Sequence, residues 1–205
     1  MAIIFPDLRH TLRADEPPFE AWTKPAAIMV LVARYPEPAV LLIHRPDTLT
    51  HHAGQIACPG GSFDPRFDHS LWDAACRETE EEVGIQVPQD AFAGFLDPVH
   101  IGVTGYTLLP AVAVIDAPMA VYPNPDEVAA YQWVSLREMR TVRKMSRIMG
   151  AGVTYRMPEF PLAWGRLWGA TARVMDQLLG HVAPDLGESL SQPGVKGAHQ
   201  KASAD

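Results

Sequence analysis

The fold is decided by Arg77-Glu78-Thr79-Glu80-Glu81-Glu82-Val83-Gly84-Ile85, a short stretch of this 205-residue chain. Glu78, Glu81 and Glu82 stand at i, i+3 and i+4, so a helix brings them onto one face, where like charges repel. Pairing of Arg77 with Glu81 relieves only part of this repulsion. A divalent cation resolves it, because carboxylate oxygens suit Mg²⁺ or Mn²⁺, which also bind substrate phosphates. The alternative, which an isolated glutamate-rich run would favour, is a solvated acidic helix face.

The residues around this stretch predict a helix over Ser70–Val83. Ser70, with Asp73 three residues later, resembles a capping box at the start of the helix. Gly84 supplies its C-terminal stop. An apolar stripe for burial recurs at i, i+4, i+7 and i+11 and falls on a different face from the three glutamates. The stripe consists of Trp72, Cys76, Thr79 and Val83.

Apolar runs on either side of this helix predict a sheet. Ala26–Ala33 and Ala39–His44 are separated by a proline-rich turn and predict two adjacent strands. Pro59-Gly60-Gly61 gives a flexible turn before the next element. Further strands are expected at Phe92–Leu96, Tyr106–Ile115 and Ala130–Val134.

Two later segments read as helical, and together with the strands they define the fold class. Leu136–Met149 is expected to be a polar helix or a mixture of loop and helix, and Trp164–Leu179 a last helix. Strands that flank a central helix and end in a second helix predict an α/β fold with a sheet between helices. We divide the chain into a lead-in segment (1–24), one folded domain (25–183) and a disordered polar tail (184–205).

The composition of the chain restricts the binding partners and the cellular compartment that we expect for it. Apolar residues make up 47% of the chain and charged residues 20%, which is typical of a globular protein. A formal net charge of −7 argues against a protein that covers nucleic-acid phosphates. The two cysteines, Cys58 and Cys76, are interpreted as small buried hydrophobic residues of a cytoplasmic protein rather than as a disulfide framework. Apolar stretches are too short for a membrane span. The oligomeric state stays open, a homodimer included.

The glutamate stretch resembles the second half of the Nudix box, Arg-Glu-apolar-x-Glu-Glu-x-Gly-apolar, with Thr79 where an aliphatic residue is usual. It follows Pro59-Gly60-Gly61, as that box requires. The resemblance implies a Nudix fold, an α/β/α sandwich with a mixed β-sheet between helices. It also implies hydrolysis of a diphosphate bond in a nucleotide derivative, with Mg²⁺ or Mn²⁺ held by Glu78, Glu81 and Glu82.

The first half of the box departs from the family pattern. Gly61 and Arg77 are sixteen residues apart, so the loop between them is two residues longer than usual. The position of the usual loop glutamate falls on His69. Asp64 and Asp68 are the two alternatives for the acidic group that supports Arg77.

A narrower resemblance points to the coenzyme A pyrophosphatase branch of the family. Arg45, Gly54 and Pro59-Gly60-Gly61 fit the branch's motif in register, and Trp168–Ala172 is similar to the start of its C-terminal helix. The resemblance implies that coenzyme A or an acyl-CoA is cleaved to 4′-phosphopantetheine and adenosine 3′,5′-bisphosphate. Departures from the branch motif lie at Ile43, Pro46, Thr50 and Cys58. At Thr50 the departure replaces an arginine that could clamp a phosphate bidentately.

The remaining site residues follow from the same resemblance. Arg45, Gly60 and Gly61 are the candidates for substrate binding. Glu127 lies six residues before Trp133, where some Nudix enzymes place an extra metal ligand or base, and a surface-loop glutamate is the alternative. The general base is accordingly sought among Glu81, Glu82 and Glu127.

Two other functions stay open at this stage. The first is hydrolysis of another nucleoside diphosphate derivative, such as NADH, ADP-ribose, a dinucleotide or a nucleoside triphosphate. The second is a non-catalytic nucleotide sensor on the same fold, against which the complete set of helix glutamates argues.

Overall fold

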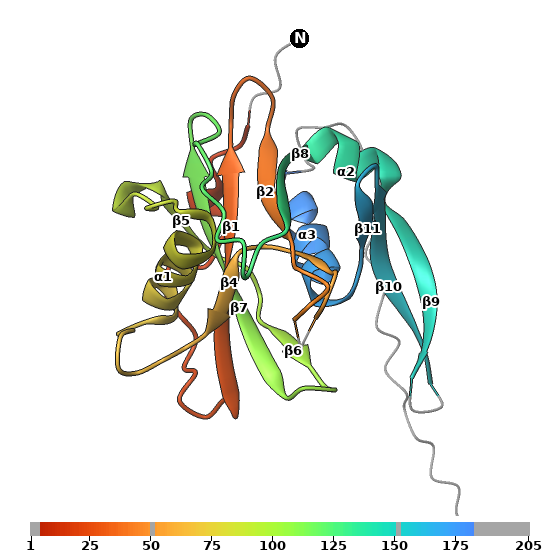
Figure 1. The fold of residues 1–205 in the computed structure, drawn as a ribbon, viewed down its shortest axis with the longest axis horizontal. Helices are drawn as coiled ribbons and strands as arrows, with labels where there is room; N and C mark the ends of the chain where they lie inside the picture. Colours follow the sequence, from red (N-terminus) through yellow and green to blue (C-terminus); the bar gives the residue numbers. More distant parts are fainter. Residues whose placement is uncertain (1–4, 50–51, 151–152, 183–205) are drawn as a thin grey trace, which may run out of the picture.

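The computed structural model describes residues 5–49, 52–150 and 153–182. In these ranges the chain forms a large mixed sheet, a small antiparallel sheet and three α-helices (Figure 1). The strands of the large sheet are β1 (Lys24–Ala33), β2 (Ala39–His44), β3 (Ile56–Ala57), β4 (Gly60–Ser62), β5 (Phe92–Phe95), β6 (Val99–Ile101), β7 (Tyr106–Ile115) and β8 (Ala130–Ser135). The small sheet contains β9 (Lys144–Gly150), β10 (Val153–Leu162) and β11 (Gly165–Leu167). The helices are α1 (Leu71–Val83), α2 (Leu136–Val142) and α3 (Gly169–Val182), and two 3₁₀ turns are η1 (Leu8–His10) and η2 (Gln89–Ala91).

The large sheet has the strand order β3-β2-β1-β7-β5, with β4 added beside β1, β6 beside β7 and β8 beside β2. β1 and β7 are parallel, in a register that runs from Lys24 opposite Tyr106 to Ala33 opposite Ile115. The other pairs of this sheet are antiparallel. The predicted mixed sheet is therefore confirmed.

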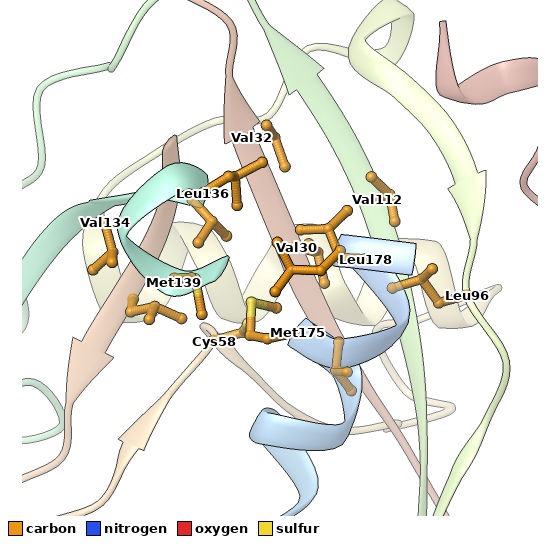
Figure 2. Close-up of a cluster of buried hydrophobic side chains, with 14 of the residues drawn as sticks. Val30, Val32, Cys58, Leu96, Val112, Val134, Leu136, Met139, Met175 and Leu178 are labelled. Atoms are coloured by element: carbon orange, nitrogen blue, oxygen red, sulfur yellow. The ribbon is translucent and has the colours of Figure 1, made fainter. Parts of the chain in front are cut away.

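Strand β1 shows why the domain has two cores. Its side chains point alternately to the two faces of the sheet. Val30 belongs to the apolar cluster that α2 and α3 cover, and Figure 2 shows this cluster. Leu31 belongs to the apolar cluster under α1. Because helices cover both faces, the strand is apolar throughout instead of alternating with polar residues. The predicted α/β/α sandwich is confirmed.

Helix α1 begins and ends as predicted, with one difference at its start. The Ser70 hydroxyl accepts a hydrogen bond from the Asp73 N–H at 3.0 Å, and Gly84 ends the helix in the left-handed conformation with φ 68°. The Asp73 carboxylate, however, accepts from the His69 N–H at 3.0 Å, so the reciprocal half of the capping box is shifted by one residue.

A residue of the predicted lead-in segment completes this cap. The Glu16 carboxylate accepts hydrogen bonds from the N–H groups of Leu71 (3.1 Å) and Trp72 (2.8 Å). Leu8 and Leu12 of the same segment lie in the core that α3 covers. The segment is thus packed against the domain, while the boundaries at 25 and 183 stay predictions. Residues 1–4 and the predicted tail at 184–205 lie outside the described residues.

Two predicted elements near the C-terminus were wrong in part. Within Leu136–Met149 only α2 is helical, and β9 takes the rest. Within Trp164–Leu179 the first residues form β11, and the helix starts at Gly169. β10 was not predicted, because Pro158 and Pro161 lie in it and proline argues against a paired strand. None of the helices in the described ranges has the length and apolarity needed to cross a bilayer.

Candidate metal and active site

Strand β4 places two glycines against helix α1, each for a different steric reason. A Cβ on Gly61 would lie 2.4 Å from Cδ of Glu78, so the Glu78 carboxylate rests directly on the glycine backbone. Gly60 has φ +147°, and its Cβ would lie 2.4 Å from the backbone oxygen of Ala27. The Pro-Gly-Gly turn therefore brings the chain closer to β1 at Gly60, and closer to the helix at Gly61, than side chains would permit.

Glu82 is buried, with 1% of its surface exposed, and both of its oxygens have partners. Oε2 accepts a hydrogen bond from the Gly60 N–H at 2.9 Å, and Oε1 lies 3.2 Å from Nη1 of Arg45. Burial raises the pKa of Glu82 to about 7, although these two partners lower it, and the charges of Glu78 and Glu127 raise it further. A carboxylate in this setting exchanges its proton near neutral pH.

Arg77 joins the loop before the helix to two of the predicted metal ligands. Its Nε and Nη2 each lie 2.9 Å from a carboxylate oxygen of Asp68, and Nη1 lies 2.8 Å from Glu78 and 3.0 Å from Glu81. The predicted pair of Arg77 with Glu81 is confirmed. Hydrogen bonds from Arg77 hold the pKa of the buried Asp68 below its usual value despite its desolvation.

The lengthened loop thus supports Arg77 through Asp68 and not through Asp64. Asp64 pairs instead with the exposed guanidinium of Arg66, and hydrogen bonds from Arg66 lower the pKa of Asp64 to about 2. The Asp64 N–H donates to the Asp68 carboxylate at 2.8 Å, which orients the acid that Arg77 uses. Sequence alone left these two acids as equal alternatives.

Glu127 lies near the helix because its loop is bonded to the last turn of α1. The Tyr122 N–H donates to the backbone oxygen of Val83 at 2.9 Å, and the Asn124 N–H donates to the backbone oxygen of Glu82 at 2.8 Å. Val128 is buried in the core on the α1 side of the sheet. Burial raises the pKa of Glu78, and the charges of Glu81 and Glu127 raise it further. The charge of Glu127 therefore acts on both Glu78 and Glu82, two of the helix glutamates.

This donor set fits a hard divalent cation. All the candidate ligands are carboxylate oxygens, the donors that Mg²⁺ and Mn²⁺ prefer. One nitrogen of Arg77 already contacts both Glu78 and Glu81, so a positive charge between these two side chains is accommodated. Across the described ranges no three acidic, histidine or cysteine side chains form a preassembled metal centre. The Glu81 side chain is 54% exposed and is held by its ion pair with Arg77.

Three side chains near the site, one threonine and two cysteines, have structural explanations. Thr79, at the aliphatic position of the motif, is fully buried, and its hydroxyl donates to the Ala75 oxygen at 2.6 Å, which satisfies the polar group. Burial raises the pKa of the Cys58 and Cys76 thiols to about 12, so neither forms a thiolate nucleophile near neutral pH. The interpretation of Cys58 as a buried hydrophobic residue is confirmed, and Cys76 is half-buried.

Sequence reasoning missed two supports of this candidate site. Besides Glu16, it missed the backbone oxygen of Ser62, which accepts from Arg77 Nη2 at 3.1 Å. No periodicity or motif marks such long-range partners. Thr50, where the branch motif has an arginine, lies outside the described residues.

Comparisons with known proteins agree with this geometry. A family model described as the NUDIX domain matches residues 23–151. The protein called "Uncharacterized Nudix hydrolase NudL" from Yersinia pestis is 35% identical over 170 residues, which cover 80% of this chain and 83% of that protein. The chain therefore belongs to the Nudix hydrolase family, whose members act on nucleoside diphosphate derivatives and generally use divalent metal ions.

Solved structures show the same fold at lower identity. A MutT/nudix family protein from Enterococcus faecalis has a TM-score of 0.56 at 18% identity, with 84% of this chain and 71% of that chain covered. The NUDIX domain of Shewanella oneidensis NrtR, complexed with ADP ribose, has a TM-score of 0.54 at 18% identity, with 80% and 91% covered. At this identity the likeness extends to the fold alone.

Proposed function

We propose that this Nudix hydrolase cleaves the diphosphate bond of coenzyme A or an acyl-CoA and releases 4′-phosphopantetheine and adenosine 3′,5′-bisphosphate. The observation that carries the hydrolytic part is that two helix glutamates meet the Pro-Gly-Gly turn: Glu78 rests on Gly61, and Glu82 accepts from the Gly60 N–H. The choice of coenzyme A rests on the motif in which Arg45, Gly54 and Pro59-Gly60-Gly61 stand in register.

Glu78, Glu81 and Glu82 are the residues that would hold Mg²⁺ or Mn²⁺. When bound, such a cation offsets the negative charge of the diphosphate and makes water more acidic. Glu78 is positioned for this role by Gly61 and Arg77, while Glu82 is held by Gly60 and Arg45. The helix thus presents carboxylates whose orientations are already restricted.

Arg45 is proposed to contact a substrate phosphate. Its Nη1 pairs with Glu82, while its Nε is buried and has no hydrogen-bond partner in the part of the chain that the structure describes. A buried guanidinium N–H without a partner costs stability, and an anionic oxygen of the substrate would satisfy it. The Gly60 N–H is used by Glu82, and the space beside the two glycines is filled by β1 and by Glu78. We therefore propose that Gly60 and Gly61 serve substrate binding by placing Glu82 and Glu78.

The reaction itself is a displacement by water. Water attacks one phosphorus, the bond from that phosphorus to the bridging oxygen breaks, and the bridging oxygen leaves with the other phosphate. A carboxylate of Glu81, Glu82 or Glu127 takes the proton of the attacking water. Positioning and charge neutralisation supply most of the catalysis, since phosphoryl transfer needs little covalent help from the protein.

The departures from the branch motif favour a second substrate class as the alternative. Thr50 stands where the branch motif has an arginine that could clamp a phosphate, and Cys58 stands in place of the residue that usually precedes the Pro-Gly-Gly turn. Both departures are compatible with another nucleoside diphosphate derivative, such as NADH or ADP-ribose.

Product analysis by mass spectrometry tests the proposal. We expect the purified chain with Mg²⁺ or Mn²⁺ to convert coenzyme A into the two named products faster than it cleaves NADH or ADP-ribose at equal concentration. Glu81→Gln should fold normally and lose activity by on the order of 100-fold. Glu80→Gln is the matched control, because Glu80 lies on the exposed side of the same helix, where Gln86 donates to it at 2.7 Å.

Two outcomes would contradict the proposal in different ways. Faster cleavage of NADH or ADP-ribose than of coenzyme A would retain the site and overturn the substrate. Undiminished activity of Glu81→Gln would overturn the assigned role of the helix glutamates.

A further inference from the structure

An aromatic side chain stands beside the candidate site on the edge strand β8. Strand β8 lies beside β2 (Figure 1). In their antiparallel pairing, Tyr131 is opposite Ile43 and Trp133 is opposite Leu41. Directly opposed residues of an antiparallel pair lie on the same face of the sheet. Leu41 and Ile43 both belong to the core under α1, so Tyr131 and Trp133 also face the α1 side.

Arg45 lies on the same face of the sheet as Trp133 and Tyr131, and it extends this row of side chains toward the carboxylates. It follows Ile43 by two residues, which is the same-face spacing of a strand, and its ion pair with Glu82 shows that it points to the α1 side. The row therefore runs from Trp133 through Tyr131 to Arg45 and the candidate active site. Glu127 lies four residues before Tyr131 in the chain.

The two aromatic residues differ in exposure, and this difference indicates a role for one of them. Trp133 is partly buried and packs against the core under α1. Tyr131 is 42% exposed, although it is a large ring on the sheet face that carries the site. A rigid aromatic ring that is exposed to this extent is a surface on which a planar base can stack.

We propose that Tyr131 is a substrate-binding residue that stacks on the nucleobase, while Arg45 and the carboxylates engage the adjoining phosphates. The inference rests on the proposed function only in assuming a nucleotide ligand, and it adds the side of the site on which the base lies. Stacking on a single aromatic ring tolerates different bases, so Tyr131 would raise the affinity for nucleotides in general over phosphate esters that lack a base.

Binding of AMP and of ribose 5-phosphate, measured by calorimetry with Mg²⁺ present, isolates the base from the phosphate and the sugar. We expect the unmodified chain to bind AMP roughly tenfold more tightly than ribose 5-phosphate. Tyr131→Ala and Tyr131→Leu should remove this preference, and Tyr131→Phe should keep it. Tyr35→Ala is the control, because Tyr35 is another exposed tyrosine (61%) and lies in the turn between β1 and β2.

Retention of the AMP preference in Tyr131→Leu, or equal binding of the two ligands by the unmodified chain, would overturn the role of Tyr131. Because the measurement requires no turnover, a failure to hydrolyse coenzyme A leaves this test intact. A positive binding result without any diphosphate cleavage would refute the proposed function and retain the stacking surface.

Discussion

Gly60 and Gly61 are neighbours in the chain, yet different parts of the molecule constrain them. The space beside Gly60 is filled by the backbone of β1, and that beside Gly61 by the end of the Glu78 side chain. Backbone cannot move aside, whereas a carboxylate can rotate away. The same substitution at the two positions should therefore separate folding from function.

Gly60→Ala is predicted to reduce mainly the stability of the fold, and Gly61→Ala mainly the activity. Gly60→Ala should destabilise the fold by more than about 2 kcal/mol, because both its positive φ and the contact with the Ala27 oxygen are strained. Gly61→Ala should keep nearly the original unfolding midpoint but lose activity by about 10- to 100-fold, since Glu78 is displaced. Urea unfolding and steady-state kinetics on both variants check this. Equal effects on both measurements would argue against the assigned positioning of Glu78.

Helix α1 is held at both ends by elements that are distant in the chain. Glu16 caps its first turn, and the loop with Tyr122 and Asn124 bonds to its last turn. The loop before the helix adds Asp68, which fixes Arg77 and through it Glu78 and Glu81. The orientation of the glutamates is thus a property of the assembled elements rather than of the helix alone.

Asp68→Asn is predicted to reduce kcat/KM by about 10-fold or more, because the neutral amide no longer balances the Arg77 charge and the arginine can turn away from Glu78 and Glu81. The loss of the buried acid should also lower the stability by about 1–3 kcal/mol. Asp64→Asn is the control in the same loop, since Asp64 pairs only with the exposed Arg66. Kinetics and the apparent affinity for Mg²⁺ should change in the first variant and stay nearly unchanged in the second. An equal loss in both would show that the loop acts as a whole.

Local periodicity predicted the elements whose neighbours impose a regular pattern. β1, β2, β7 and α1 were found within a residue or two, because burial on two faces or on one stripe leaves a readable signal. β9 and β10 were not found. Both are partly exposed and β10 carries two prolines, so they show no such signal, and only the pairing of β10 with β9 and with β11 makes them strands.

At the scale of the whole molecule, the small sheet is joined to the domain by burial, and its own strands are joined to one another by one acid. Phe160, Leu162 and Leu167 lie in the core under α3. Glu159, which is buried, accepts hydrogen bonds from Ser146 and Arg166 at 2.7 Å, and Lys144 lies 3.0 Å away. These hydrogen bonds lower the pKa of Glu159 to about 2. One acid therefore links all three strands of this sheet.

The depressed pKa predicts how stability depends on pH. An unfolded glutamate titrates at about 4.3, so the contribution of Glu159 is complete above that pH and is lost as the pH falls through about 2. Glu159→Gln should be less stable than the unmodified chain at pH 6, and the difference should shrink between about pH 4 and 2. Urea unfolding at a series of pH values measures this. Glu37→Gln, in an exposed pair with Arg137, is the control, and its difference should be small throughout. A difference for Glu159→Gln that does not change with pH would contradict the charge-based role.

By itself, the sequence determined the family motif, the helix that carries Glu78, Glu81 and Glu82, and the central strands, because these depend on spacing along the chain. It also marked Glu127 by its offset from Trp133. Only the tertiary structure decided that Asp68 rather than Asp64 supports Arg77, that Glu82 is buried between Gly60 and Arg45, and that Tyr131 stands beside the site. Those relations join residues far apart in the chain or equivalent within one loop. Such contacts are set by packing and strand register, which local pattern does not encode.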